Sequence, residues 1–256
     1  MLSNLRTFGL IFALVSCAGA IAAQASWNNK PYTQWSKPEA EAILNHPPWA
    51  IRNEVRIRFD KETQVAAGSY SGVSSGAASQ SQTEVTSQAP VDFIFTLRLR
   101  SALPVRQALV RLRQLQSDVK MSDQERALFD ARTKGLLECP ACANNYVITL
   151  SYKSTNTPGA DAVYTLFKGG RLADLQRYVY IANERGERRQ LIYFIPPKAP
   201  GDEATFYFLR LDDHGAPLLG PENRQLVINL TDNQINPITN FKVDVSSLML
   251  NGKVEF

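Results

Sequence analysis

Two stretches of this chain, 51–59 and 92–100, alternate apolar residues with polar or charged ones. A period of two places the apolar residues on one face of a β-strand and the others on the opposite face. One face of each strand must therefore be buried, and we expect the two strands to be antiparallel neighbours. The residues between them, 61–90, are rich in Ser, Gly and Gln. They bury too little area to offset their ordering entropy, so we predict a disordered insertion there.

Three helices are predicted around these strands. Serine followed three residues later by glutamate is a capping box, which opens one helix over 36–45 and another over 122–137. Apolar residues at helical spacing predict a third helix over 104–118. The buried face of the helix over 122–137 is assigned to Leu128, Ala131 and Gly135, or to their neighbours Phe129 and Leu136.

Short strands separated by turns follow from about residue 160 to the end, one of them over 175–181, and Asn251-Gly252 is a strong hairpin signal. We therefore predict an α+β protein in which N-terminal helices pack on an antiparallel sheet, followed by an all-β antiparallel sheet or sandwich. The expected division is an α+β part over 26–155, which contains the insertion, and a β-rich part over 156–256. The two parts could share one sheet.

The first residues resemble an export signal. Arg6 precedes a short apolar run, and Ala23-Gln24-Ala25 is typical of a cleavage site, so we expect residues 1–25 to be a signal peptide. Alternatively, 14–17 resembles a lipobox that would place a lipid anchor on Cys17. The remaining chain has no apolar run long enough for a transmembrane helix. The expected location is the periplasm or the outer surface of a bacterial cell.

Cys139 and Cys142 form a Cys-x-x-Cys motif at the end of the helix predicted over 122–137. We expect a strand to leave the motif directly, so that the thiols face the negative end of the helix, beside Glu138. Both the helix end and Glu138 should raise the pKa values of the thiols. This favours a local structural disulfide formed after export. A redox role is the alternative. A zinc site would need the distant His46 and His214 as further ligands, so no metal or cofactor is predicted.

No group of residues has the pattern of an active site. Residues 72–76 fit Gly-x-Ser-x-Gly, but they lie in a Ser/Gly-rich tract rather than between a strand and a helix. The chain has only 2 histidines, and both fall in predicted turns. We therefore expect a protein that is not an enzyme.

Arginines gather on the polar face of the two alternating strands. Like charges on neighbouring strands repel one another, and either solvation with partial pairing or a bound anion would relieve this. A nucleic acid is the less suitable anion because no aromatic residues are interleaved with the basic ones. An anionic envelope component remains as a candidate partner. The residues assigned to it are Arg56, Arg58, Arg98 and Arg100.

Two terminal segments, 32–50 and 241–256, resemble a group of uncharacterised exported bacterial proteins. The shared features are a tryptophan-flanked helix, a central Cys-x-x-Cys and a terminal Asn-Gly or Asp-Gly hairpin. The resemblance implies an exported bacterial protein without an assigned reaction, so it supplies no catalytic residue. The predicted function is a non-catalytic binding or structural module of the cell envelope, its ligand unspecified. The alternative is a periplasmic thiol-disulfide protein that uses Cys139 and Cys142.

Overall fold

The computed structural model describes residues 27–57, 91–117, 121–155, 157–230 and 241–256. Several sequence predictions lie outside these residues and are not addressed by the structure. They are the signal peptide with Cys17, the insertion over 61–90, and Arg58.

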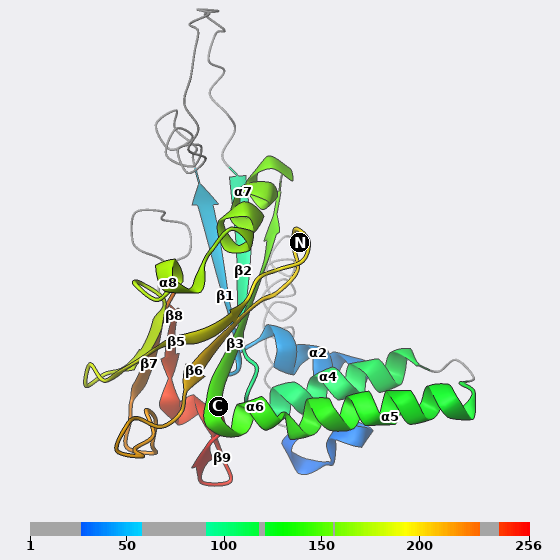
Figure 1. Cartoon of the computed structure of the whole chain (residues 1–256). Helices are drawn as coiled ribbons and strands as arrows, with labels where there is room; N and C mark the ends of the chain where they lie inside the picture. The colour runs from blue at the N-terminus through cyan, green and yellow to red at the C-terminus, as the bar shows by residue number, and fades with distance from the viewer. Residues whose placement is uncertain (1–26, 58–90, 118–120, 156, 231–240) are drawn as a thin grey trace, which may run out of the picture.

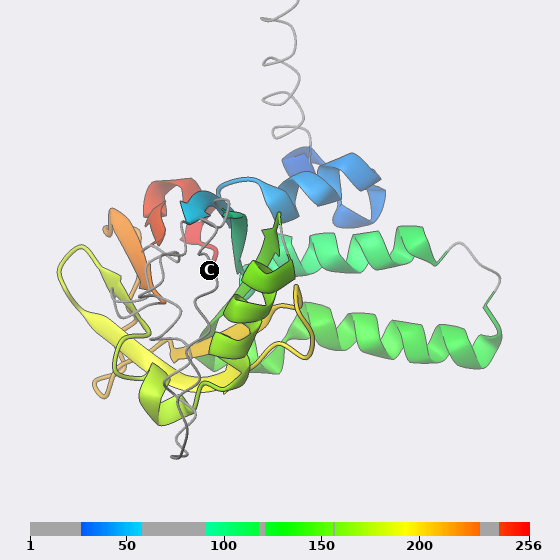
Figure 2. The ribbon, with the colours of Figure 1, turned by 90° about the horizontal axis from the view of Figure 1, so that it is seen from above.

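Eight antiparallel strands form one sheet, which curls strongly (Figure 1). Viewed from above in Figure 2, the strands surround a common interior. The predicted α+β fold with an antiparallel sheet is confirmed. In spatial order the strands are β1 (Ala50–Ile57), β2 (Val91–Leu99), β3 (Asn145–Ser154), β6 (Ala204–Leu209), β5 (Arg188–Ile195), β4 (Tyr180–Asn183), β7 (Gln225–Asn229) and β8 (Phe241–Asp244).

The interior of the curled sheet is the hydrophobic core. The strand register aligns apolar positions from strand to strand, so that Leu99 of β2 pairs with Ile148 of β3, which pairs with Phe206 of β6. Ile228 of β7 and Phe241 of β8 continue the same layer at the other end of the sheet. All five side chains are fully buried. The sheet thus buries its apolar face largely against itself, as the period-two pattern requires.

The two predicted parts of the chain share this sheet, because β3 of the first part pairs with β6 of the second. The second part is not all-β as predicted, since it contains helix α7 (Thr157–Lys168) and the short helix α8 (Leu172–Leu175). Val163 and Phe167 are buried and lie four residues apart, which is the spacing of one helix face. Phe167 packs against Phe206, with ring centroids 5.9 Å apart. The strand predicted over 175–181 is wrong for residues 175–179, because Leu175 ends α8 and β4 begins only at Tyr180.

The N-terminal helices are α2 (Lys37–Asn45), α4 (Leu103–Gln116) and α5 (Asp123–Glu138). Both predicted capping boxes are present, at Ser36 and at Ser122. Helices α4 and α5 run side by side and project away from the sheet (Figures 1 and 2). The predicted buried face of α5 is wrong: Thr133 is the one buried residue of this fully described helix, and Leu128 is 52% exposed. The reason is that most of α5 extends past the sheet and has only α4 beside it.

Three tryptophans pack together where the N-terminal segment meets the sheet. The Trp27 ring lies edge-on to the Trp35 ring at 5.6 Å and to the Trp49 ring at 5.4 Å. Trp35 Nε1 donates to the carbonyl of Trp27 at 2.9 Å, and Trp49 Nε1 donates to the carbonyl of Glu255 at 2.9 Å. The cluster therefore fastens the N-terminal segment and the start of β1 to the C-terminal segment.

The remaining elements are short. The predicted hairpin is confirmed, because the two strands flanking Asn251 and Gly252 pair and both residues have positive φ, 51° and 76°. The other short elements, together with the two hairpin strands β9 (Met249–Leu250) and β10 (Lys253–Val254), complete the fold. They are η1 (Trp27–Asn29), η2 (Tyr32–Gln34), α6 (Pro140–Asn144) and η3 (Val245–Leu248).

Candidate functional site

The arginines predicted to form one anion-binding face fall into two groups. At the outer end of β1 and β2, Arg56 Nε lies 2.6 Å from Asp92 Oδ1. This hydrogen bond raises the pKa of Arg56 and lowers that of Asp92. Arg52 Nη2 lies 2.7 Å from Glu54 Oε1 on the same strand. Arg52 and Arg56 are exposed, and each has a carboxylate of its own.

At the other end of β2, one arginine near the end of the strand and one just after it share a carboxylate. Arg98 Nη1 lies 2.6 Å and Arg100 Nη1 3.9 Å from the carboxylate of Glu203. Arg98 also donates from Nε to the carbonyl of Leu44 at 2.7 Å and from Nη1 to Ser151 Oγ at 3.1 Å. Arg98 therefore joins the end of α2 to the sheet. Arg100 has the longer ion pair and more freedom to bind something else.

Arg100 lies in the wall of a hollow of about 210 Å³ on the outer face of the sheet. The floor is formed by β3 and β6, where Val147 pairs with Tyr207 and Thr149 with Thr205. The opposite wall is the end of α5, which contributes Gly135, Leu136 and Cys139. Glu203 completes the lining. The hollow thus lies where the two halves of the chain meet.

The hollow itself is lined by one arginine and one glutamate, Arg100 and Glu203, and the positive charges of Arg98 and Arg113 lie near them. Burial lowers the pKa of Arg100, Glu203 opposes this shift, and the nearby charges of Arg113 and Arg98 lower the pKa further. The charges of Arg98 and Arg113 therefore act on Arg100, which forms a long ion pair with Glu203. An anion placed beside Arg100 would reduce this repulsion.

Two hydroxyl groups are available in the same hollow. Thr149 is 2% exposed, and its Oγ1 has no hydrogen-bond partner among the described residues. Burial raises the pKa of Tyr207, and the adjacent Tyr193 raises it further, while Arg100 opposes the change. The Tyr207 hydroxyl therefore stays protonated near neutral pH and can donate a hydrogen bond. A buried hydroxyl without a partner is unfavourable, so Thr149 is suited to a group that enters the hollow.

The wall formed by α5 is held by a disulfide and two arginines. Cys139 and Cys142 are bonded, with Cα atoms 5.3 Å apart, as predicted. Arg106 donates to the carbonyl of Leu137, and Arg210 Nε donates to the carbonyl of Cys142 at 2.9 Å. These restraints fix the end of α5 over the sheet.

The surroundings of the motif differ from the prediction in one respect. No strand leaves Cys142 directly, because Cys142 lies within the five-residue helix α6, which ends at Asn144. Cys139, in the left-handed region (φ 41°), ends α5 and begins α6. Cys139 therefore lies at the negative C-terminal end of α5 and also at the positive N-terminal end of the short helix α6, and the two ends have opposite effects on a thiol pKa.

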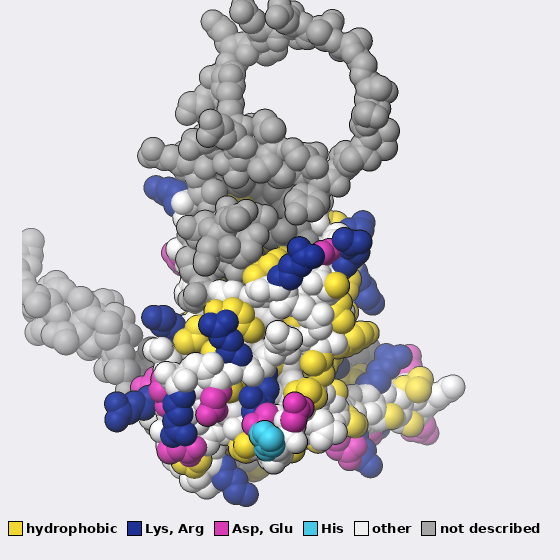
Figure 3. Space-filling model, turned by 60° about the vertical axis from the view of Figure 1, so that its left-hand side comes forward, with side chains coloured by type: hydrophobic (Ala, Val, Ile, Leu, Met, Phe, Trp, Pro, Cys, Tyr) yellow, Lys and Arg dark blue, Asp and Glu magenta, His cyan; other side chains and the backbone are white. Residues whose placement is uncertain are grey.

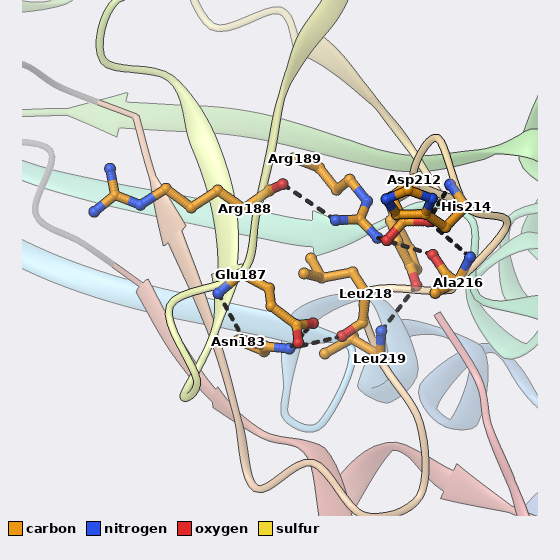
Figure 4. A network of polar contacts seen from close by, with 10 residues as sticks. Asn183, Glu187, Arg188, Arg189, Asp212, His214, Ala216, Leu218 and Leu219 are labelled. Carbon is orange, nitrogen blue, oxygen red and sulfur yellow. Dashed lines mark hydrogen bonds and ion pairs between the residues drawn. The ribbon is translucent and has the colours of Figure 1, made fainter.

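A second polar group lies in the turn after β6 (Figure 4). Asp212 Oδ1 accepts hydrogen bonds from the backbone N–H groups of His214 at 2.9 Å and Ala216 at 2.8 Å. The N–H of Ala216 is the main cause of a lowered pKa at Asp212. Arg189 donates to the carbonyl of Ala216 at 2.9 Å and lies 3.7 Å from Asp212. Asp212 thus closes a turn, and this group is structural.

The sequence predicted Arg100 and the disulfide of this site and missed Thr149, Glu203 and Tyr207. Thr149 falls in the strand expected after the Cys-x-x-Cys motif, but no feature of the local sequence indicates that this strand, β3, pairs with β6. Comparisons with protein-family models, with curated proteins and with solved structures gave no match. Among the described residues, no group of three or more His, Cys, Asp or Glu is arranged to hold a metal ion. No described helix combines the length and apolarity needed to cross a bilayer.

Proposed function

We propose that this chain is a non-catalytic, exported binding module that holds an anionic group in the hollow at Arg100. The observation that carries the proposal is the shortage of negative charge there: Arg98 and Arg100 share Glu203, and the charge of Arg113 also acts on Arg100. Arg56, by contrast, has Asp92 to itself. The Thr149 hydroxyl, which has no hydrogen-bond partner in the part of the chain that the structure describes, supplies a further donor for the same group. The proposed site is therefore smaller than the arginine face predicted from the sequence.

Export is proposed on the leader-like sequence at residues 1–25, and the Cys139–Cys142 disulfide is compatible with an oxidising compartment. The resemblance to exported bacterial proteins points the same way. The measurement is the mass of the mature protein purified from a bacterial envelope fraction. A chain beginning at Ser26 supports a cleaved signal, an acylated Cys17 supports a lipid anchor, and an uncleaved chain contradicts export.

Anion binding is tested by titrating the mature chain with inorganic phosphate at low ionic strength. We expect Arg100→Gln to weaken phosphate binding at least about tenfold, because a hydrogen bond to a charged group contributes about 1.5–3 kcal/mol. Glu203→Gln should tighten phosphate binding by about fivefold, because it removes the repulsion between the Glu203 carboxylate and the bound phosphate. For two unit charges about 4 Å apart in water this repulsion is about 1 kcal/mol. Added salt should weaken binding as the screening length falls below about 10 Å.

Arg56→Gln is the matched control, because Arg56 is on the same sheet but is paired at 2.6 Å with Asp92. Its phosphate affinity should stay within twofold of the parent. Equal losses in Arg56→Gln and Arg100→Gln would favour the whole arginine face over the hollow. Binding that is indifferent to both, or weakened by Glu203→Gln, would contradict the proposal.

The thiol-disulfide alternative is favoured by one observation, the position of Cys139 at the start of α6. A thiolate at a helix N-terminus is stabilised, although α6 has only five residues. Reduction by a mild dithiol followed by pH titration of the Cys139 thiol separates the two functions. A disulfide that resists reduction supports the binding module, whereas a thiol pKa well below the ordinary value supports the redox protein.

A further inference from the structure

Apolar side chains lie exposed on the outer face of the sheet beside the hollow. Four of them form what we call the apolar strip: Ile192, Tyr193 and Ile195 of β5 and Leu209 of β6. They are 37%, 57%, 37% and 45% exposed, respectively. On the face drawn in Figure 3, hydrophobic side chains reach the surface between groups of Lys and Arg.

The strip and the hollow adjoin, because two residues of the strip pair with two residues that line the hollow. Tyr193 pairs with Tyr207, with ring centroids 5.4 Å apart, and Ile195 pairs with Thr205. Tyr207 and Thr205 also line the hollow. A group bound beside Arg100 therefore has an apolar surface within reach, across one strand of the sheet.

The outward positions of other strands show that this apolarity is not general. On β1, for example, three of the outward positions hold Arg52, Glu54 and Arg56, all of them exposed, and the first holds the buried Ala50. Single exposed apolar residues are common on proteins, whereas adjacent ones next to a recess mark binding surfaces. The apolar strip lies where a ligand held at Arg100 would extend.

The hollow is small for a whole ligand. Its volume of about 210 Å³ is below the roughly 300–1,000 Å³ of sites that enclose a drug-sized molecule. Only a head group fits inside, so the rest of the ligand must lie on the surface. The positive excess at Arg100 selects an anionic head, and the strip selects an apolar remainder.

We infer that the ligand is a single-chain anionic amphiphile, with its phosphate or carboxylate head at Arg100 and Thr149 and its hydrocarbon chain along the apolar strip. The inference rests on the proposed function and names the class of its ligand. Each fully buried methylene strengthens binding about fourfold. A hydrocarbon chain that lies on an open strip is only partly buried, so each methylene increases the affinity by less than fourfold. Twelve carbons together should still increase the affinity strongly.

The test is calorimetric titration of the mature chain with three probes: dodecyl phosphate below its micelle concentration, inorganic phosphate, and dodecyl maltoside. Dodecyl phosphate should bind at least about tenfold more tightly than inorganic phosphate, and dodecyl maltoside should bind weakly. Ile195→Ser should reduce dodecyl phosphate affinity at least about threefold and leave phosphate affinity unchanged. Arg100→Gln should weaken both. Leu128→Ser on α5 is the control: Leu128 is 52% exposed, more than the 37% of Ile195, and does not line the hollow, so the change should alter neither affinity.

The outcomes separate this inference from the proposed function. If phosphate binds and the dodecyl chain adds nothing, the amphiphile is wrong and the anion site stands. If no probe binds, both are wrong. If dodecyl maltoside binds as well as dodecyl phosphate, the strip binds hydrocarbon without the anion site. Sedimentation velocity covers self-association: a parent dimer that Ile195→Ser converts to monomer would show that the strip binds a second copy instead. Thermal melts of each variant confirm that it folds.

Discussion

Replacing Thr149 with valine should stabilise the ligand-free protein, which is an unusual expectation for a buried polar residue. Thr149 is 2% exposed and its Oγ1 has no partner among the described residues. A buried polar group without a hydrogen bond costs about 1–3 kcal/mol. Valine has a similar shape, replaces the hydroxyl with a methyl group and is well suited to the centre of β3. We therefore expect Thr149→Val to raise the free energy of unfolding by about 1–2 kcal/mol.

Urea unfolding followed by tryptophan fluorescence measures this change, and a rise in melting temperature of about 2–4 °C per kcal/mol should accompany it. Ser101→Ala is the matched control, because Ser101 is 3% exposed and its Oγ accepts from the N–H of Val147 at 3.0 Å. Its loss leaves that N–H unpaired and should destabilise the protein by about 1–2 kcal/mol. Thr149→Val should also weaken phosphate binding. A Thr149→Val protein that is no more stable than the parent would refute the reasoning, since it would mean that water already satisfies the hydroxyl.

Two further predictions concern stability. Trp35→Ala should lower the free energy of unfolding by about 3–5 kcal/mol, because Trp35 is 2% exposed and contacts Trp27; Trp35→Phe should lose less, and an equal loss in urea titrations would argue against ring packing as the cause. Asp212 has a folded pKa below its unfolded value, chiefly through the N–H of Ala216, so its contribution is complete above about pH 4 and disappears as the pH falls through the lowered folded pKa. The difference in unfolding free energy between the parent and Asp212→Asn should therefore shrink on acidification from pH 5 to pH 2, and a constant difference would contradict a stabilising ionised carboxylate.

The sequence predicts best where a short range of residues determines the structure. Both capping boxes and the Asn251-Gly252 hairpin are fixed by side-chain to backbone contacts or by positive φ within four residues. The alternation in β2 was recognised because all its inward residues are apolar. Helix α7 (Thr157–Lys168) was not predicted. Its buried residues Val163 and Phe167 are four positions apart, and this spacing also places two residues on one face of a strand.

The candidate site depends on contacts that the sequence does not display. The apolar residues of α5 suggest a buried face, yet Leu128 is exposed because the helix runs past the edge of the sheet. Glu203 approaches Arg98 across 105 positions of the chain. Sequence analysis could propose that the arginines need an anion. It could not predict which of them obtain a carboxylate from within the protein, because that depends on the pairing of β3 with β6.

That pairing also has a consequence for assembly of the molecule. One half of the sheet consists of β1 to β3 and the other of β4 to β8. Within the described sheet, the two halves are joined only where β3 pairs with β6. Thr149 and Thr205 face each other across this seam. Neither half by itself contains a complete hollow, so a ligand that occupies it binds only the joined state. Occupancy would then favour closure of the seam by mass action, and hydrogen exchange of the β3 and β6 amides would slow in proportion to the ligand bound.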